Sequence, residues 1–167
     1  VVAGVWGGDS GWERRGGGAM KGGCTCGAVR YRMTEPPMFV NCCHCSWCQR
    51  ETGSAFALNA IIEADRLEVT GSVEAVMLPS ASGKGQELLR CASCGTALWS
   101  HFAGVGRLAA FVRVGTLDDP GACPPEAHIY TTTKLPWVVL EAGVPAFEEY
   151  YSLAEVWPVQ AQARRAA

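Results

Sequence analysis

The sequence has no long hydrophobic run and no excess of charge of either sign. Hydrophobic residues make up 49% of the 167 residues, yet no stretch approaches the ~18 consecutive apolar residues of a membrane span. The formal net charge is -2, so no global field draws the chain to nucleic acid or to an anionic membrane. The first nineteen residues lack the continuous apolar segment of a signal peptide, and we expect a cytoplasmic protein. We therefore predict neither a membrane nor a nucleic-acid partner.

Cysteine, in contrast, is abundant and clustered. Seven of the nine cysteines fall into three tight groups, which are Cys24-Thr25-Cys26, Cys43-His44-Cys45-Ser46-Trp47-Cys48 and Cys91-Ala92-Ser93-Cys94. Thiols one to three residues apart can converge on one tetrahedral zinc ion at about 2.3 Å, whereas they are poorly placed for disulfide geometry. In a reducing compartment such clusters bind metal rather than pair. The pattern predicts a zinc protein.

The seven thiols divide most simply into two zinc sites. Cys91 and Cys94, followed by Gly95, have the form of a zinc knuckle, and Cys24 and Cys26 complete a closed four-thiolate structural site. Cys43, Cys45 and Cys48 then form an open site with one position left for water or substrate. The alternative adds Cys42 and closes the second site. Neighbouring side chains in an extended segment point to opposite faces, which favours the open site.

The remaining pattern is mostly that of β-strands. Alternation and strand-length apolar runs predict strands over 28–33, 55–62, 73–78, 87–90, 97–102 and 108–114, separated by Gly-rich turns. Two short helices are expected, at 46–52 and 148–156. Residues 1–19 are rich in Gly and lack periodicity, which indicates a flexible N-terminal extension. Residues 158–167 are expected to form a polar tail that is frayed or a short helix.

Four segments together resemble the glutathione-dependent formaldehyde-activating enzyme family, which includes centromere protein V. They are Gly22-Gly23-Cys24-Thr25-Cys26-Gly27-Ala28-Val29-Arg30-Tyr31, the middle thiol motif with Gly53-Ser54-Ala55-Phe56, the Cys91–Leu98 motif, and His128-Ile129-Tyr130 with Lys134-Leu135-Pro136-Trp137. The resemblance implies a mainly β, Mss4-like, zinc-stabilised fold with little helix, over a domain at 20–157. It also implies two zinc ions, divided as above, and condensation of glutathione with formaldehyde to S-(hydroxymethyl)glutathione, formally a carbon–sulfur lyase reaction. Two positions depart from the family pattern, because the neutral Gln49 and the acidic Glu51 flank Arg50 where the family carries basic residues.

The thiol chemistry supports the same reaction. Zinc with three thiolates is a weak Lewis acid that suits a thiol as fourth ligand better than it suits hydroxide formation. Cys43, Cys45 and Cys48 are therefore the predicted catalytic residues, and the expected substrates are glutathione and a small aldehyde. Trp47, Arg50 and Trp137 are predicted to bind the thiol substrate, although packing explains the tryptophans equally well. The alternative function is a non-catalytic zinc-stabilised β module that binds a protein partner.

Other polar residues have two interpretations at this stage. His44 and His128 are either structural hydrogen-bonding residues, which we favour, or proton relays. Arg90, Arg113 and Lys134 are either carboxylate anchors or ordinary solvated charges, and the second is favoured. Cys42 is expected to be a buried thiol that faces away from the zinc ligands.

Overall fold

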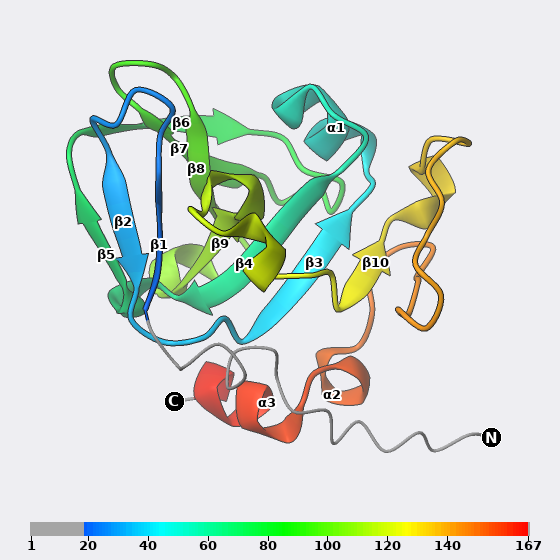
Figure 1. The fold of residues 1–167 in the computed structure, drawn as a ribbon. Coiled ribbons are helices and arrows are strands. Elements are labelled where there is room, and N and C mark those ends of the chain that lie inside the picture. The colour runs from blue at the N-terminus through cyan, green and yellow to red at the C-terminus, as the bar shows by residue number, and fades with distance from the viewer. Residues whose placement is uncertain (1–18, 167) are drawn as a thin grey trace.

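The structure is a computed structural model that describes residues 19–166 (Figure 1). The extension expected over residues 1–19 therefore lies, apart from Ala19, outside the described residues. The strands form a small sheet and a large sheet, and the prediction of a mainly β fold with little helix is confirmed. The small sheet has the order β1 (Met20–Gly23), β2 (Arg30–Met33) and β5 (Leu67–Thr70). The large sheet has the order β10 (Ala127–Ile129), β3 (Phe39–Cys43), β4 (Ala57–Glu63), β9 (Ala109–Arg113), β8 (Ala97–Phe102), β7 (Gln86–Cys91) and β6 (Val73–Leu78).

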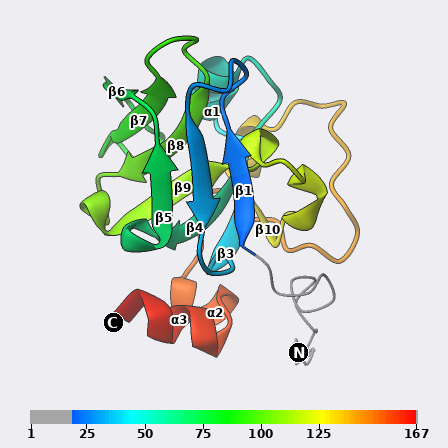
Figure 2. The same cartoon turned by 60° about the vertical axis from the view of Figure 1, so that its left-hand side comes forward.

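The two sheets pack face to face around the first hydrophobic core. In β2, Tyr31 and Met33 are buried while Arg30 and Arg32 point to solvent, as the alternation in the sequence predicts. Tyr31 and Met33 pack against the inner face of the large sheet, to which β4 contributes Ala60 and Ile62. Figure 2 shows the small sheet lying across the large one.

The outer face of the large sheet carries the second core and the helices. Helix α1 (Ser46–Thr52) follows β3, and α2 (Leu153–Val156) and α3 (Val159–Ala166) lie beside the lower end of the sheet in Figure 1. Phe39 stacks on Trp157 with 5.4 Å between ring centroids, and Ala161 of α3 is buried in the same core. Arg164 of α3 binds both carboxylate oxygens of Glu63 in β4, at 2.8 and 2.6 Å. The C-terminal segment is thus packed against the outer face of the large sheet.

Several predicted elements match the structure closely. The helix at 46–52 and the strands at 73–78 and 97–102 have the predicted bounds. Of the helix predicted over 148–156, only Leu153–Val156 is helical, because residues before it pair their backbones with the segment after β10. Short 3-10 helices occupy Ala64–Arg66, Gly106–Leu108, Val114–Thr116, Pro120–Ala122 and Thr131–Thr133. None of the described helices is long and apolar enough to cross a membrane.

Candidate functional site

Four cysteines from two distant turns converge at one end of the sheets. Cys24 and Cys26 lie in the turn between β1 and β2, and Cys91 and Cys94 lie where β7 turns into β8. Their sulfur atoms lie within 4.8 Å of one another, with 3.5 Å between Cys24 and Cys26 and 3.8 Å between Cys26 and Cys91. Four sulfurs each about 2.3 Å from a zinc ion are separated by about 3.8 Å, so the spacing fits a tetrahedral zinc site. We call this group the closed cluster.

The backbone around the closed cluster stabilises thiolates. The Val29 amide donates to the sulfur of Cys24 at 3.2 Å. The hydroxyl and backbone of Thr96 lower the pKa of Cys94 to about 5. Gly95 has a φ of 73°, which only glycine adopts readily, and its amide donates to the Cys91 carbonyl at 2.9 Å. The knuckle conformation expected from the sequence is therefore present.

Three further cysteines converge where β3 meets α1. Cys43 is the last residue of β3, Cys45 is the N-cap of α1, and Cys48 lies in the first turn of the helix. Their sulfurs also lie within 4.8 Å of one another, and the Cys48 amide donates to the Cys45 sulfur at 3.4 Å. We call Cys43, Cys45 and Cys48 the open cluster.

The thiols of the open cluster share their protons unequally. Hydrogen bonds from Cys43 and Cys48 lower the pKa of Cys45 to about 2. The Cys45 thiolate and the Cys48 thiol in turn raise the pKa of Cys43 strongly, and burial adds to this effect. One thiolate therefore forms readily, and a divalent cation is needed to hold all three ionised. Such a donor set of three sulfurs fits a zinc ion with one further ligand position.

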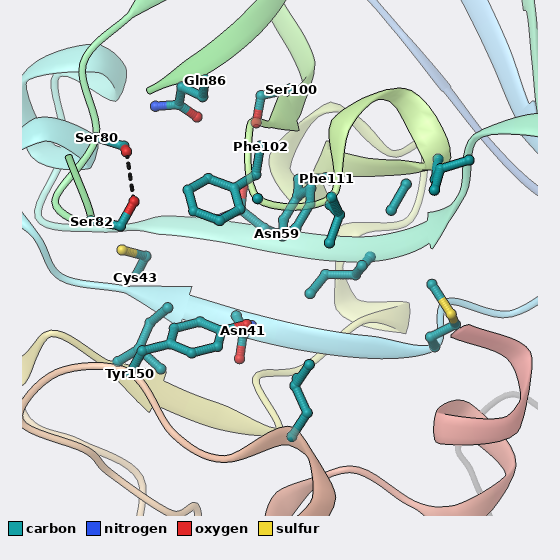
Figure 3. A pocket seen from close by; sticks show the side chains of 18 of the residues that line it. Asn41, Cys43, Asn59, Ser80, Ser82, Gln86, Ser100, Phe102, Phe111 and Tyr150 are labelled. Carbon is teal, nitrogen blue, oxygen red and sulfur yellow. Dashed lines mark hydrogen bonds between the residues drawn. The ribbon is translucent and has the colours of Figure 1, made fainter. Parts of the chain in front are cut away.

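The open cluster lies in a cavity of about 1020 Å³ over the outer face of the large sheet (Figure 3). All three of its cysteines line this cavity, as do Asn41, Asn59 and Arg113 from β3, β4 and β9. The Cα register pairs Asn41 with Asn59 and Asn59 with Arg113, so these three residues form one row across the sheet. The closed cluster does not line this cavity. Only the open cluster is thus placed to meet a ligand there.

A buried ion-pair network supports the polar row. Arg113 is 6% exposed, donates to the side-chain oxygen of Asn59, and lies 3.1 Å from Glu51. Glu51 also binds Arg90 at 3.1 Å. The expectation that Arg113 is a solvated charge is wrong, because Glu51 compensates the guanidinium inside the protein. The acidic residue that departs from the family pattern is therefore a structural partner of a cavity residue.

Cys42 belongs to neither cysteine cluster. It is buried with His44 and His128, and these three side chains form a separate group of converging ligand atoms. Nε2 of His44 lies 3.0 Å from Nδ1 of His128 and 3.5 Å from the Cys42 sulfur. Burial and the neighbouring His128 lower the pKa of His44 to about 4, so both rings are neutral near pH 7.

The predicted substrate-binding residues lie at different places. Trp47 lines the cavity and is 41% exposed. The guanidinium of Arg50 lies 5.9 Å from the ring of Trp47, but Arg50 is not among the residues that line the cavity. Trp137 is 71% exposed and does not line it either. Gln49 donates to the carbonyls of His44 at 2.8 Å and Thr133 at 2.9 Å, and so links α1 to the segment after β10.

Sequence reasoning missed several residues of the cavity. Asn41, Asn59, Phe102, Phe111 and Tyr150 line it but were not singled out. Asn59 and Phe111 alternate with the inner-face residues of their strands, so strand alternation was the available signal. Asn41 lies in β3, where every residue is buried and no alternation is visible.

Comparison with known proteins relates the chain to one family. The family model described as "Glutathione-dependent formaldehyde-activating enzyme" matches residues 19–133. A curated protein of Halomonas elongata, provisionally named a glutathione-dependent formaldehyde-activating enzyme, is 31% identical over 132 residues, which cover 74% of this chain and 82% of that protein. A crystal structure of a Rhodobacter sphaeroides protein is 19% identical, with a TM-score of 0.43 over 77% of this chain and 99% of the other, which is a distant likeness. The family model covers most of the chain, including both cysteine clusters, and the chain belongs to the glutathione-dependent formaldehyde-activating enzyme family.

Proposed function

We propose that this protein is a zinc-dependent enzyme that condenses glutathione with an aldehyde, formaldehyde being the simplest, to give an S-(hydroxyalkyl)glutathione. The enzyme would formally be a carbon–sulfur lyase, because the condensation is the reverse of cleavage of the carbon–sulfur bond. The observation that carries this proposal is the convergence of three thiols, rather than four, in a large cavity. Family membership supports the same substrates.

The proposal assigns one zinc ion to each cluster. In the open cluster, a bound zinc ion supplies a cation that favours the thiolate form of a sulfur ligand near neutral pH. Cys43, Cys45 and Cys48 hold that ion, and their burial limits access of water. In the closed cluster Cys24, Cys26, Cys91 and Cys94 fill the coordination tetrahedron, so that site stabilises the fold.

Residues of the polar row have a matching role beside the open cluster. Addition of a thiolate to a carbonyl carbon places negative charge on the carbonyl oxygen, which needs a donor. The Nε of Arg113 is buried and has no acceptor among the described residues. Arg113 therefore offers a cation and a donor on the same cavity wall as the thiols, and Glu51 and Asn59 fix its position. Trp47 also lines the cavity and adjoins Cys48 in the sequence, and we assign it to the peptide part of glutathione.

The decisive experiment compares glutathione with S-methylglutathione, which cannot form a thiolate. Calorimetry of the zinc-loaded protein should show binding of glutathione and at least about tenfold weaker binding of the methylated peptide. Exchange NMR should show formaldehyde and glutathione interconverting with their adduct faster than without protein. Cys48→Ala should abolish the excess rate, whereas Cys123→Ala, a thiol outside all the clusters, should keep it.

A non-catalytic function has one observation in its favour. Trp137 and Val139 are 71% and 91% exposed in the segment after the Thr131–Thr133 turn, where a protein partner could cover them. If glutathione and S-methylglutathione bind equally weakly and the exchange rate is unchanged, a partner-binding module becomes the better account.

A further inference from the structure

The residues on the outer face of the large sheet change from polar to apolar with distance from the open cluster. Successive residues on one face of a strand are two apart, so β4 carries Ala57, Asn59 and Ile61 in order along this face. Ala57 pairs with Cys43, Asn59 with Asn41 and Arg113, and Ile61 with Phe111. The cavity floor therefore runs from thiols through a polar row to an apolar region.

The apolar region is extensive and built from several elements. Phe111 of β9 and Phe102 of β8 meet edge to face, with ring centroids 6.3 Å apart. Ile61 is 2% exposed beside them. Met38, Leu153 and Trp157 also line the cavity, and they pack in the same hydrophobic core as Ile61 and Phe111. Figure 3 shows Phe102 and Phe111 lying along the cavity that also contains Cys43.

Formaldehyde and glutathione leave this region unexplained. Formaldehyde has a single carbon and needs no apolar wall. Glutathione carries two carboxylates and no large apolar group. Three arginines that line the cavity each pair with a glutamate, which leaves Lys84 and Arg165 as lining cations with no ion pair among the described residues. The pairs are Arg113–Glu51, Arg107–Glu87 and Arg164–Glu63. The cavity is also at the upper end of the roughly 300–1,000 Å³ found for drug-sized ligands.

We propose that the cavity takes an aldehyde with a sizeable apolar group, an alkyl chain of about six carbons or an aryl ring, lying over Phe111, Ile61 and Phe102. This inference rests on the proposed function, and it names the class of the second substrate. The carbonyl carbon then lies toward the open cluster, and the carbonyl oxygen toward Asn41 and Arg113. Glutathione enters from the side of Trp47.

The step balances without an oxidant or reductant. The glutathione sulfur forms a bond to the carbonyl carbon, and the π electrons of the carbonyl move to its oxygen. The proton lost by the thiol ends on that oxygen, which gives a neutral hemithioacetal. The apolar group takes no part in the bond changes and contributes only through burial.

The test is a chain-length series of aldehydes at fixed glutathione. Exchange NMR with the zinc-loaded protein should show the excess rate over background, per unit of aldehyde, rising from acetaldehyde through butanal to hexanal. Full burial of each added CH₂ corresponds to roughly fourfold, and we expect at least about 30-fold over the series. Phe102→Ser should remove most of this gain. Met77→Ser, an apolar to serine change at an exposed β6 position outside the cavity, should not.

A second probe separates the cavity from the chemistry. Hexanamide has the length of hexanal but forms no adduct with thiols, and calorimetry should show that it binds the wild type and binds Phe102→Ser more weakly. Thermal melts of both serine variants show whether they are folded. If glutathione and formaldehyde exchange is accelerated but is independent of chain length, and hexanamide does not bind, this inference is wrong while the proposed function stands. If hexanamide binds but no aldehyde exchange is accelerated, the proposed function is wrong and the aldehyde assignment falls with it.

Discussion

Glu51 and Arg113 form an ion pair inside the protein, although 62 residues separate them in the sequence. Their side chains are 3% and 7% exposed, and an oxygen of Glu51 lies 3.1 Å from Nη2 of Arg113. Removing one partner of a buried pair leaves an uncompensated charge. The pair therefore couples the helix that carries Cys48 to the strand that forms the polar row.

The first prediction concerns this pair. Glu51→Gln should lower the free energy of unfolding by about 3 kcal/mol, because Arg113 stays buried without its carboxylate. Glu68→Gln is the matched control, since Glu68 pairs with Arg32 at 2.7 Å with both side chains about half exposed. Such exposed pairs contribute about 0–1 kcal/mol. Urea denaturation of both variants measures the difference, and equal losses would contradict the role given to Glu51.

The second prediction separates the two cysteine clusters. Cys94→Ala opens the closed cluster, and because zinc binding at a closed structural site is largely folding free energy, this variant should lose most of its stability. Cys45→Ala should leave a folded protein that holds one zinc ion. Thermal melts and metal analysis of the two variants decide the matter. An equal loss of folding in both would argue against one structural and one open site.

The third prediction concerns the neighbours Cys42 and Cys43. Cys42 converges with His44 and His128, whereas Cys43 converges with Cys45 and Cys48. Cys42→Ser should therefore keep both zinc ions and the full glutathione response, and Cys43→Ser should lose one zinc ion. Metal analysis with glutathione calorimetry tests this. Loss of a zinc ion from Cys42→Ser would mean that the second site is closed.

The fourth prediction concerns removal of metal. Three protein ligands hold an ion less tightly than four, so a limiting amount of a zinc chelator at equilibrium should first remove one ion per chain without unfolding. Complete removal should then unfold the protein. A colorimetric chelator and far-UV circular dichroism follow the two stages together. Release of both ions in a single step with loss of structure would show that the clusters do not differ in affinity.

The sequence predicts those parts of the fold that have a local pattern. The strand over Val73–Leu78 and the helix over Ser46–Thr52 appear with the expected bounds. The strand Phe39–Cys43 was not predicted, because all five of its residues are buried and it has no alternation. The stretch around His128 has a strand-like sequence, and it forms the three-residue strand Ala127–Ile129. Its parallel pairing with β3 could not be predicted, because no local pattern specifies the partner strand.

In the candidate site, too, the features with a local sequence pattern are predictable and those without one are not. The spacing of the cysteines predicts both clusters, because ligands close in sequence must be close in space. The polar row could not be predicted, because Asn41, Asn59 and Arg113 come together only through the register of three strands. Trp137 matches a family segment, yet whether it reaches the cavity depends on a loop conformation that no motif encodes.

The closed cluster also sets an order of events during synthesis. Cys26 and Cys91, whose sulfurs lie 3.8 Å apart in the finished protein, are 65 residues apart in the sequence. At about 5–20 residues per second, the ribosome delivers the second pair of ligands about 3–13 s after the first. During that interval Cys24 and Cys26 lack their own partners, and the clustered thiols already made are those of Cys43, Cys45 and Cys48. The closed cluster, and with it the proposed zinc site, is therefore complete only once Cys94 has been made, and until then the thiols of Cys24 and Cys26 depend on a reducing environment.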